Sequence, residues 1–188
     1  MENKKNYLIN YEALNDFVFQ YYAGKDIMHD LTHIERVLKT LVGLKRYINQ
    51  QIDNEAVLYT AYFHGFIYLD EKAIRNWLAE QNIPDDRIDF IVKIAWESQK
   101  SEDAETVEGK LLHDAHIIEG GKTFWLIKSL ITGSVRDQSL DETIEYIENN
   151  LLNEAKCYFE KSKEVHNQAL GFTKEVISDL KNGIEGIF

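Results

Sequence analysis

The sequence predicts an all-α protein that folds as a single compact multi-helix bundle. The chain of 188 residues has the length of one domain. Its one proline, Pro84, leaves long stretches free of helix breakers. Apolar residues recur three and four positions apart, as in amphipathic helices, and no β-branched run alternates with polar residues as a strand would. We expect about eight or nine helices in one domain that spans residues 1–188.

The first half of the chain is predicted to form helices separated by short turns. Gly24 is suited to end the first helix, and Asp30 is suited to cap the second. The third helix contains the aromatic stretch AYFHGFIYLD, residues 61–70, which has the composition of a buried segment. The helices expected here cover residues 11–23, 30–49, 54–67 and 71–81.

The second half is predicted to be helical as well. Pro84 falls in the first turn of the next helix, where proline is tolerated. A polar, acidic loop, SEDAETVEG at 101–109, leads into the following one, and SLDE at 139–142 resembles a capping box at the start of a long helix. The helices expected here cover residues 84–98, 106–118, 122–131, 140–161 and 163–181.

Composition excludes several classes of protein. A single cysteine, Cys157, rules out a disulfide framework and fits a reducing compartment, so we expect a cytoplasmic protein. The first ten residues, MENKKNYLIN, lack the apolar core of a signal peptide, and no apolar run approaches the roughly 18 residues that span a bilayer. A formal net charge of −11 argues against duplex nucleic acid as a partner. A small anionic phosphorylated molecule stays possible if a metal or local cations neutralise it.

Histidines gather in three short segments of the sequence. Five of the six lie in MHDLTH at 28–33, YFHG at 62–65 and LLHDAHIIEGG at 111–121, each among residues suited to a core. Imidazole nitrogens and carboxylate oxygens converging from three helices would suit a divalent metal ion. The histidines in these segments are His29, His33, His64, His113 and His116.

Each residue also has a structural interpretation. His29 could flank a helix start, and His64, taken alone, has the pattern of a core histidine. Asp114 lies among apolar residues, so its carboxylate must be paired, protonated or bound to a metal. His166 in KEVHNQ is predicted to lie on the surface, and Cys157 has no neighbouring base in sequence that would make it a nucleophile.

Other reaction motifs are absent. The sequence contains no GxSxG, no GxxxxGK[ST], no GxGxxG after a strand and no HExxH. His29 and His33 have the spacing of the two HExxH histidines but lack the glutamate that follows the first. The positive residues nearest the third segment are predicted to form a charged helix face; they are Lys110, Lys122, Lys128 and Arg136.

Together the three segments resemble those of the HD superfamily of metal-dependent phosphohydrolases, and in particular its small single-domain bacterial members. HDLTHIERV at 29–37 matches the form HDxxHxxRV, YFHG at 62–65 takes the place of the helical His-Asp dyad, and LLHDAHIIEG at 111–120 that of a DAD-like segment. The resemblance covers about residues 25–135 and leaves the helices expected over 140–181 unmatched.

The resemblance implies a metal site. Carried over residue by residue, the ligands fall on His33, His64, position 65 and Asp114, but position 65 is Gly65 where the family has the dyad Asp. The second acidic position of the DAD-like segment is His116, which could substitute as a ligand, as could His29. The ion could be Mn, Fe, Co, Ni, Zn or Mg, although mixed nitrogen and oxygen ligation argues against Mg alone.

Two explanations of the glycine at position 65 remain open, and so do three hypotheses for the function of the protein. A glycine inside a helix costs about 1 kcal/mol relative to alanine, so either the dyad Asp was lost with catalysis or the backbone is closely approached there. The favoured hypothesis is a divergent metal-dependent phosphohydrolase acting on a small phosphorylated metabolite or nucleotide. The alternative is a degenerate HD-domain protein that binds a metal, an anion or a protein partner without turnover. In the third hypothesis the histidines are only structural. Catalytic residues are not assigned by the sequence.

Overall fold

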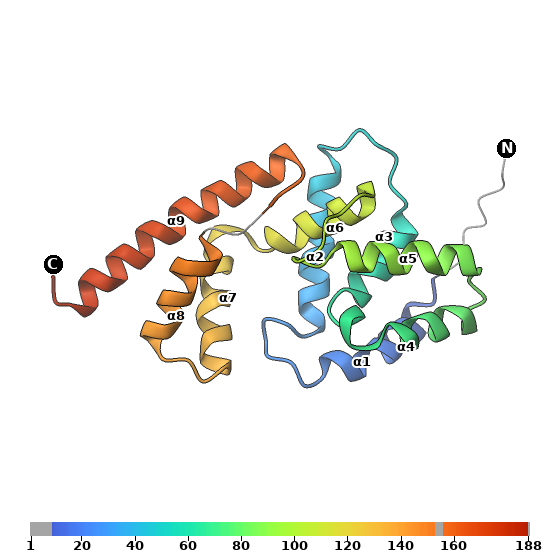
Figure 1. Cartoon of the computed structure of the whole chain (residues 1–188), viewed down its shortest axis with the longest axis horizontal. Coiled ribbons are helices and arrows are strands. Elements are labelled where there is room, and N and C mark those ends of the chain that lie inside the picture. Colours follow the sequence, from blue (N-terminus) through green and yellow to red (C-terminus); the bar gives the residue numbers. More distant parts are fainter. Residues whose placement is uncertain (1–8, 153–155, 188) are drawn as a thin grey trace.

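Helices make up all the regular structure of the part of the chain that the computed structural model describes, residues 9–152 and 156–187. This confirms the predicted all-α class. None of these helices offers the long apolar stretch that a bilayer crossing requires. The elements, shown in Figure 1, are α1 (Tyr11–Tyr22), α2 (Leu31–Lys45), α3 (Asn54–Phe63), α4 (Ile67–Glu80), α5 (Asp85–Glu97), α6 (Val107–Ile117), α7 (Gly121–Val135), α8 (Leu140–Tyr146), the π-helix η1 (Ile147–Leu151) and α9 (Glu160–Ile184).

Two clusters of buried apolar side chains hold these helices together. The larger one joins α1 to α6, and aromatic rings fill its centre: Phe17 stacks on Trp77 at a centroid distance of 5.1 Å and meets Phe63 edge-on at 6.2 Å. The smaller cluster joins α7, α8, η1 and α9 around Leu126 and Ile177. Figure 1 shows α7, α8 and α9 lying together beside the bundle of the first six helices.

The caps read from the sequence are present. Asp30 accepts a hydrogen bond from the Thr32 N–H at 2.9 Å, and Ser139 and Glu142 form the reciprocal capping box. Pro84, predicted in the first turn of its helix, is instead the N-cap of α5, one position before the first helical residue. Such caps stabilise a helix by about 1 kcal/mol each, so they fix where these helices begin.

The helix predicted over 54–67 is wrong from His64 onward. Helix α3 ends at Phe63, His64 is its C-cap, and α4 starts three residues later at Ile67. Side chains satisfy the freed carbonyl groups: Tyr22 donates to the Tyr62 carbonyl at 2.8 Å, and Lys25 donates to that of Gly65 at 2.9 Å. Tyr22 of α1 and Lys25, which follows that helix, therefore stabilise the end of α3 at the histidine that the sequence placed inside a continuous helix.

The long helix predicted over 140–161 is also wrong. Helix α8 passes into η1, which ends at Leu151, and the described residues 156–159 are not helical. Cys157, predicted to lie within this helix, is in that non-helical stretch. Helix α9 begins at Glu160 and extends to Ile184, so it is longer than the helix predicted over 163–181.

A buried carboxylate fixes the start of α9. Asp114, on α6, is fully buried, and its two oxygens accept the Tyr158 N–H at 3.0 Å while Oδ2 also accepts the Phe159 N–H at 2.9 Å. These two amides immediately precede α9, where a helix leaves donors unsatisfied and favours negative charge. The contact ties the start of the C-terminal helix to α6.

We expect Asp114→Asn to lower the free energy of unfolding by about 1–3 kcal/mol, because an amide replaces a charged acceptor that is buried among backbone donors. Urea denaturation followed by circular dichroism measures this change. Asp16→Asn, at an exposed position of α1, is the matched control and is expected to stay within about 0.5 kcal/mol. Equal stability of the two variants would contradict the role given to Asp114.

Candidate functional site

Three histidines from three helices lie close together. They are His33 on α2, His64 at the C-cap of α3 and His116 on α6, and each offers a ring nitrogen within 4.8 Å of the other two. The Nε2 atoms of His33 and His64 are 3.0 Å apart. The rings of His64 and His116 lie edge to face at a centroid distance of 4.6 Å.

Glu119 orients the first of these histidines. It lies in the turn between α6 and α7, where Gly120 and Gly121 adopt left-handed φ angles of 69° and 72°. The His33 Nδ1–H donates to Glu119 Oε2 at 2.8 Å. Because the proton then resides on Nδ1, the Nε2 lone pair of His33 points at His64. A carboxylate behind a histidine is the usual arrangement in metal sites.

Two cations share the same carboxylate. Arg36 Nε donates to Glu119 Oε1 at 2.6 Å, and Lys128 Nζ donates to Oε2 at 3.0 Å. Burial raises the pKa of Glu119, but the His33 hydrogen bond and the Lys128 and Arg36 cations outweigh it and lower this pKa to about 2. Glu119 therefore stays ionised while only 2% exposed.

The three histidines are uncharged at neutral pH. Burial lowers the pKa of His33, and it holds the pKa values of His64 and His116 well below the ordinary value, with further lowering by the neighbouring imidazoles. A neutral imidazole presents the lone pair that a metal ion binds.

Geometry and hydrogen bonding of the cluster fit a metal ion. Two nitrogen ligands of a tetrahedral ion with bonds of roughly 2.0–2.1 Å lie about 3.4 Å apart, close to the separation between His33 and His64. His116 Nδ1 is buried and has no hydrogen-bond partner within the described part of the chain. A buried nitrogen without a partner is costly, and a nearby cation would relieve that cost.

The predicted site residues are only partly brought together. His33 and His64 lie side by side, and the third member is His116, one of the two possible substitutes. Asp114 does not join them, because its oxygens are bound to the amides that precede α9. His29, the other substitute, pairs through Nδ1 with Asp26 at 2.8 Å.

Gly65 is closely approached by a side chain of α1. A Cβ atom at this position would lie 2.4 Å from Tyr22 Oη and 3.0 Å from its Cζ. Tyr22 is buried and its hydroxyl donates to the Tyr62 carbonyl, so a shift of the ring away from position 65 would cost this hydrogen bond. The close-approach account of Gly65 therefore has a direct structural basis.

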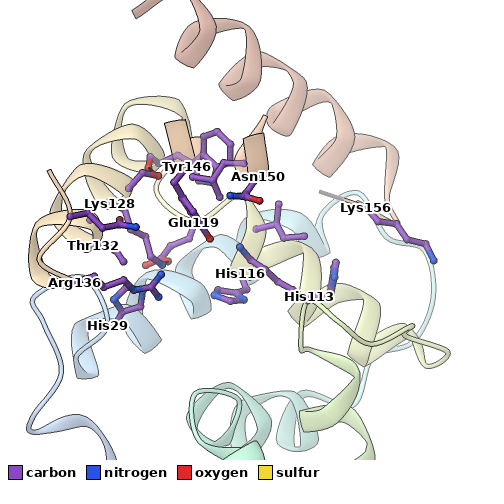
Figure 2. Close-up of a pocket in the computed structure, with 17 residues that line it drawn as sticks. His29, His113, His116, Glu119, Lys128, Thr132, Arg136, Tyr146, Asn150 and Lys156 are labelled. Carbon is purple, nitrogen blue, oxygen red and sulfur yellow. Dashed lines mark hydrogen bonds and ion pairs between the residues drawn. The ribbon is translucent and has the colours of Figure 1, made fainter. Parts of the chain in front are cut away.

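A cavity of about 480 Å³ opens beside the cluster. His116 and Glu119 form part of its wall (Figure 2), and Trp125, Tyr146 and Leu151 supply apolar surface. Glu119 is the one carboxylate among the described lining residues. The cations in the lining are Lys100, Lys128, Arg136 and Lys156. A wall of this composition attracts an anion.

The remaining histidines and the cysteine lie outside the cluster. His113 also lines the cavity. The surface position predicted for His166 is wrong: the residue is 5% exposed, and its ring meets Trp125 edge-on. Burial raises the pKa of Cys157 to about 12, which leaves no thiolate to act as a nucleophile.

The sequence analysis did not identify Glu119 or Arg36 as site residues, and it assigned Lys128 and Arg136 only to a charged helix face. Arg36 follows His33 by three residues within α2, so the two share a face of that helix, and Glu119 follows His116 by three in the turn after α6. That spacing is a signal that could have found both. Lys128 and Arg136, predicted only as part of a charged helix face, line the cavity.

Comparisons with known proteins identify the fold. No protein-family model matches the chain, and no curated protein matches it. The solved structure of Bacillus subtilis YpgQ in complex with ADP is similar, with a TM-score of 0.74 at 19% identity over 94% of this chain and 99% of that one. The Lin1889 protein from Listeria innocua gives a TM-score of 0.70 at 19% identity over 95% and 98% of the two chains. A Lactobacillus plantarum protein gives 0.72 at 14% over 98% and 100%.

We expect Gly65→Ala to destabilise the protein by about 1–3 kcal/mol, because the new methyl group overlaps Tyr22. Combining it with Tyr22→Phe should cost less than the sum of the two single changes, since the removed hydroxyl makes the closest contact. Chemical denaturation of the four proteins measures this coupling. Gly43→Ala is the control, because nothing lies within 4 Å of a Cβ there and the change should stabilise α2. Additive costs would argue against the overlap.

Proposed function

We propose that this chain is a divergent HD-type phosphohydrolase that depends on a divalent metal and acts on a small phosphorylated metabolite or nucleotide. The ligands in this proposal are His33, His64 and His116, with the last in place of the Asp114 expected from the resemblance. The observation that carries the proposal is the position of the cluster: His116 and Glu119 lie in the wall of a cavity that is rich in cations.

The fold comparison supports a phosphorylated ligand. YpgQ, whose fold this chain shares, was solved with ADP bound. The three segments that resemble HD signatures supply all three histidines of the cluster and also Arg36 and Glu119, which hold His33 in place. Sequence resemblance and geometry therefore point to the same residues.

A divalent ion held by the cluster would supply Lewis-acid polarisation of a phosphoryl oxygen and activation of water for attack on phosphorus. The chain itself does the rest. Arg136 and Lys128 lie on one side of His116, and Lys156, which is paired with Asp103, lies on the other (Figure 2). These cations would bind and orient phosphate oxygens, while Glu119 keeps the Nε2 lone pair of His33 directed into the cluster.

Binding without turnover is the second candidate, and Gly65 favours it. The side chain that would complete the dyad is missing, and Tyr22 occupies its space. In this alternative the cluster and the cavity retain a metal or an anion, or act through a protein partner, but no phosphate is released.

The first test is metal content. Purified protein is expected to carry about one transition-metal ion per chain by mass spectrometry, and His64→Ala should lose it, because removing one of three ligands weakens the site strongly. His166→Ala, which removes a buried histidine outside the cluster, is the matched control and should keep the ion. Absence of metal from the wild-type protein, even after incubation with Mn²⁺ or Co²⁺, would contradict the proposal.

The same proteins separate the two candidates. With nucleoside phosphates as substrates, release of phosphate or pyrophosphate that is lost in His33→Ala would support hydrolysis. Metal and nucleotide binding without any release would support the second candidate instead.

A further test concerns the cavity. Arg136→Gln is expected to weaken binding of ADP by roughly tenfold, because it removes one charge-assisted contact to phosphate worth about 1–2 kcal/mol. Calorimetric titration measures the Kd. Lys39→Gln, at an exposed position of α2 outside the cavity lining, should leave it unchanged. Equal effects of both variants would show that only net charge matters.

A further inference from the structure

The cluster lacks a carboxylate ligand. Within the described residues, the group of side chains able to hold a metal consists of three imidazoles: His33, His64 and His116. Proteins bind hard cations such as Mg²⁺ and Mn²⁺ mainly through oxygen, whereas Zn²⁺ and Co²⁺ accept imidazole nitrogen readily. A set of three imidazole nitrogens without a carboxylate oxygen therefore affects which metal ion the protein binds.

Among the described residues, two buried carboxylates on or next to α6, Asp114 and Glu119, are bound elsewhere. Both Asp114 oxygens accept backbone amides before α9. Glu119 gives one oxygen to Arg36 and the other to His33 and Lys128. Gly65 has no side chain, and Tyr22 fills the adjacent space.

The charges around the cluster also favour borderline metal ions over hard ones. Glu119 supplies one negative charge behind His33, and Arg36 and Lys128 both pair with it. An incoming dication meets neutral ligands and a carboxylate that is already neutralised. Such a site holds an ion through covalent character in the metal–nitrogen bonds more than through charge, which favours borderline ions over hard ones.

We propose that His33, His64 and His116 form a nitrogen-only site that selects zinc-class ions, Zn²⁺ and Co²⁺, over Mn²⁺ and Mg²⁺. This inference rests on the proposed function, which places a divalent metal on these residues. Three protein nitrogens would occupy three of the four positions of a tetrahedral ion and leave the fourth open. This is the usual arrangement of zinc sites that bind a further ligand. His116 faces the cavity, so that position is available to an anion there.

The experiment compares four ions on metal-free protein. Zn²⁺ and Co²⁺ are expected to bind at one per chain, and the Co²⁺ form should show the intense visible absorption of four-coordinate cobalt. Mn²⁺ and Mg²⁺ at the same free concentrations should leave the site unfilled, as read by Mn²⁺ electron paramagnetic resonance and by competition with a chromophoric chelator.

Two variants sharpen the comparison. His116→Asp introduces an oxygen ligand and should lower the ratio of Zn²⁺ to Mn²⁺ affinity by about tenfold or more, with weaker Co²⁺ absorption as the coordination number rises. Asp114→Asn, measured well below its unfolding midpoint, should leave the Co²⁺ spectrum unchanged. If His116→Asp fails to fold, the comparison of the four ions on the wild-type protein and the Co²⁺ spectrum of Asp114→Asn still test the nitrogen-only site.

The contrary outcomes are distinct. Binding of Mn²⁺ as tight as that of Zn²⁺, or a Co²⁺ spectrum that changes in Asp114→Asn, would overturn the nitrogen-only site while leaving the proposed metal dependence intact. Failure of all four ions to bind would overturn both.

Discussion

The buried carboxylate of Glu119 is the constraint on which the site depends. An ionised group that is 2% exposed must be compensated, and here three donors from α2 and α7 converge on it. The turn that carries Glu119, between α6 and α7, is thereby tied to α2. The same contacts set the His33 tautomer. One carboxylate thus links the packing of three helices to the direction of a nitrogen lone pair.

Local patterns in the sequence predicted the all-α class and the caps at Asp30 and Ser139, but they could not show long-range partners. The amphipathic spacing over 140–161 continues past Leu151, so it gave no sign that Asp114, 44 residues before Tyr158, claims the amides there. A carboxylate among apolar residues can be satisfied in several ways, and the resemblance favoured a metal where the chain uses backbone donors. The proximity of His33 and His64 followed from the resemblance; the role of Glu119 needed coordinates, because its partner lies 86 residues away.

The fold is retained at low sequence identity. At 14–19% identity, the similar solved structures superpose over nearly the whole chain. Packing tolerates such change because apolar side chains of similar volume replace one another. A ligand set does not tolerate it in the same way: exchanging a carboxylate for an imidazole alters both charge and donor softness. The group of His33, His64 and His116 departs at this point from the ligands that the resemblance implied, since His116 lies where Asp114 was expected.

The contact between Tyr22 and Gly65 has a historical consequence. If an ancestor carried aspartate at position 65, reversion of that single codon would now produce a chain whose new side chain overlaps a buried, hydrogen-bonded tyrosine. The order of steps matters: a smaller residue at position 22 must come first, and that step alone opens a void in the aromatic core. Each single step passes through a less stable protein. Tyr22 therefore disfavours replacement of Gly65 by a larger residue, independently of any selection on the site.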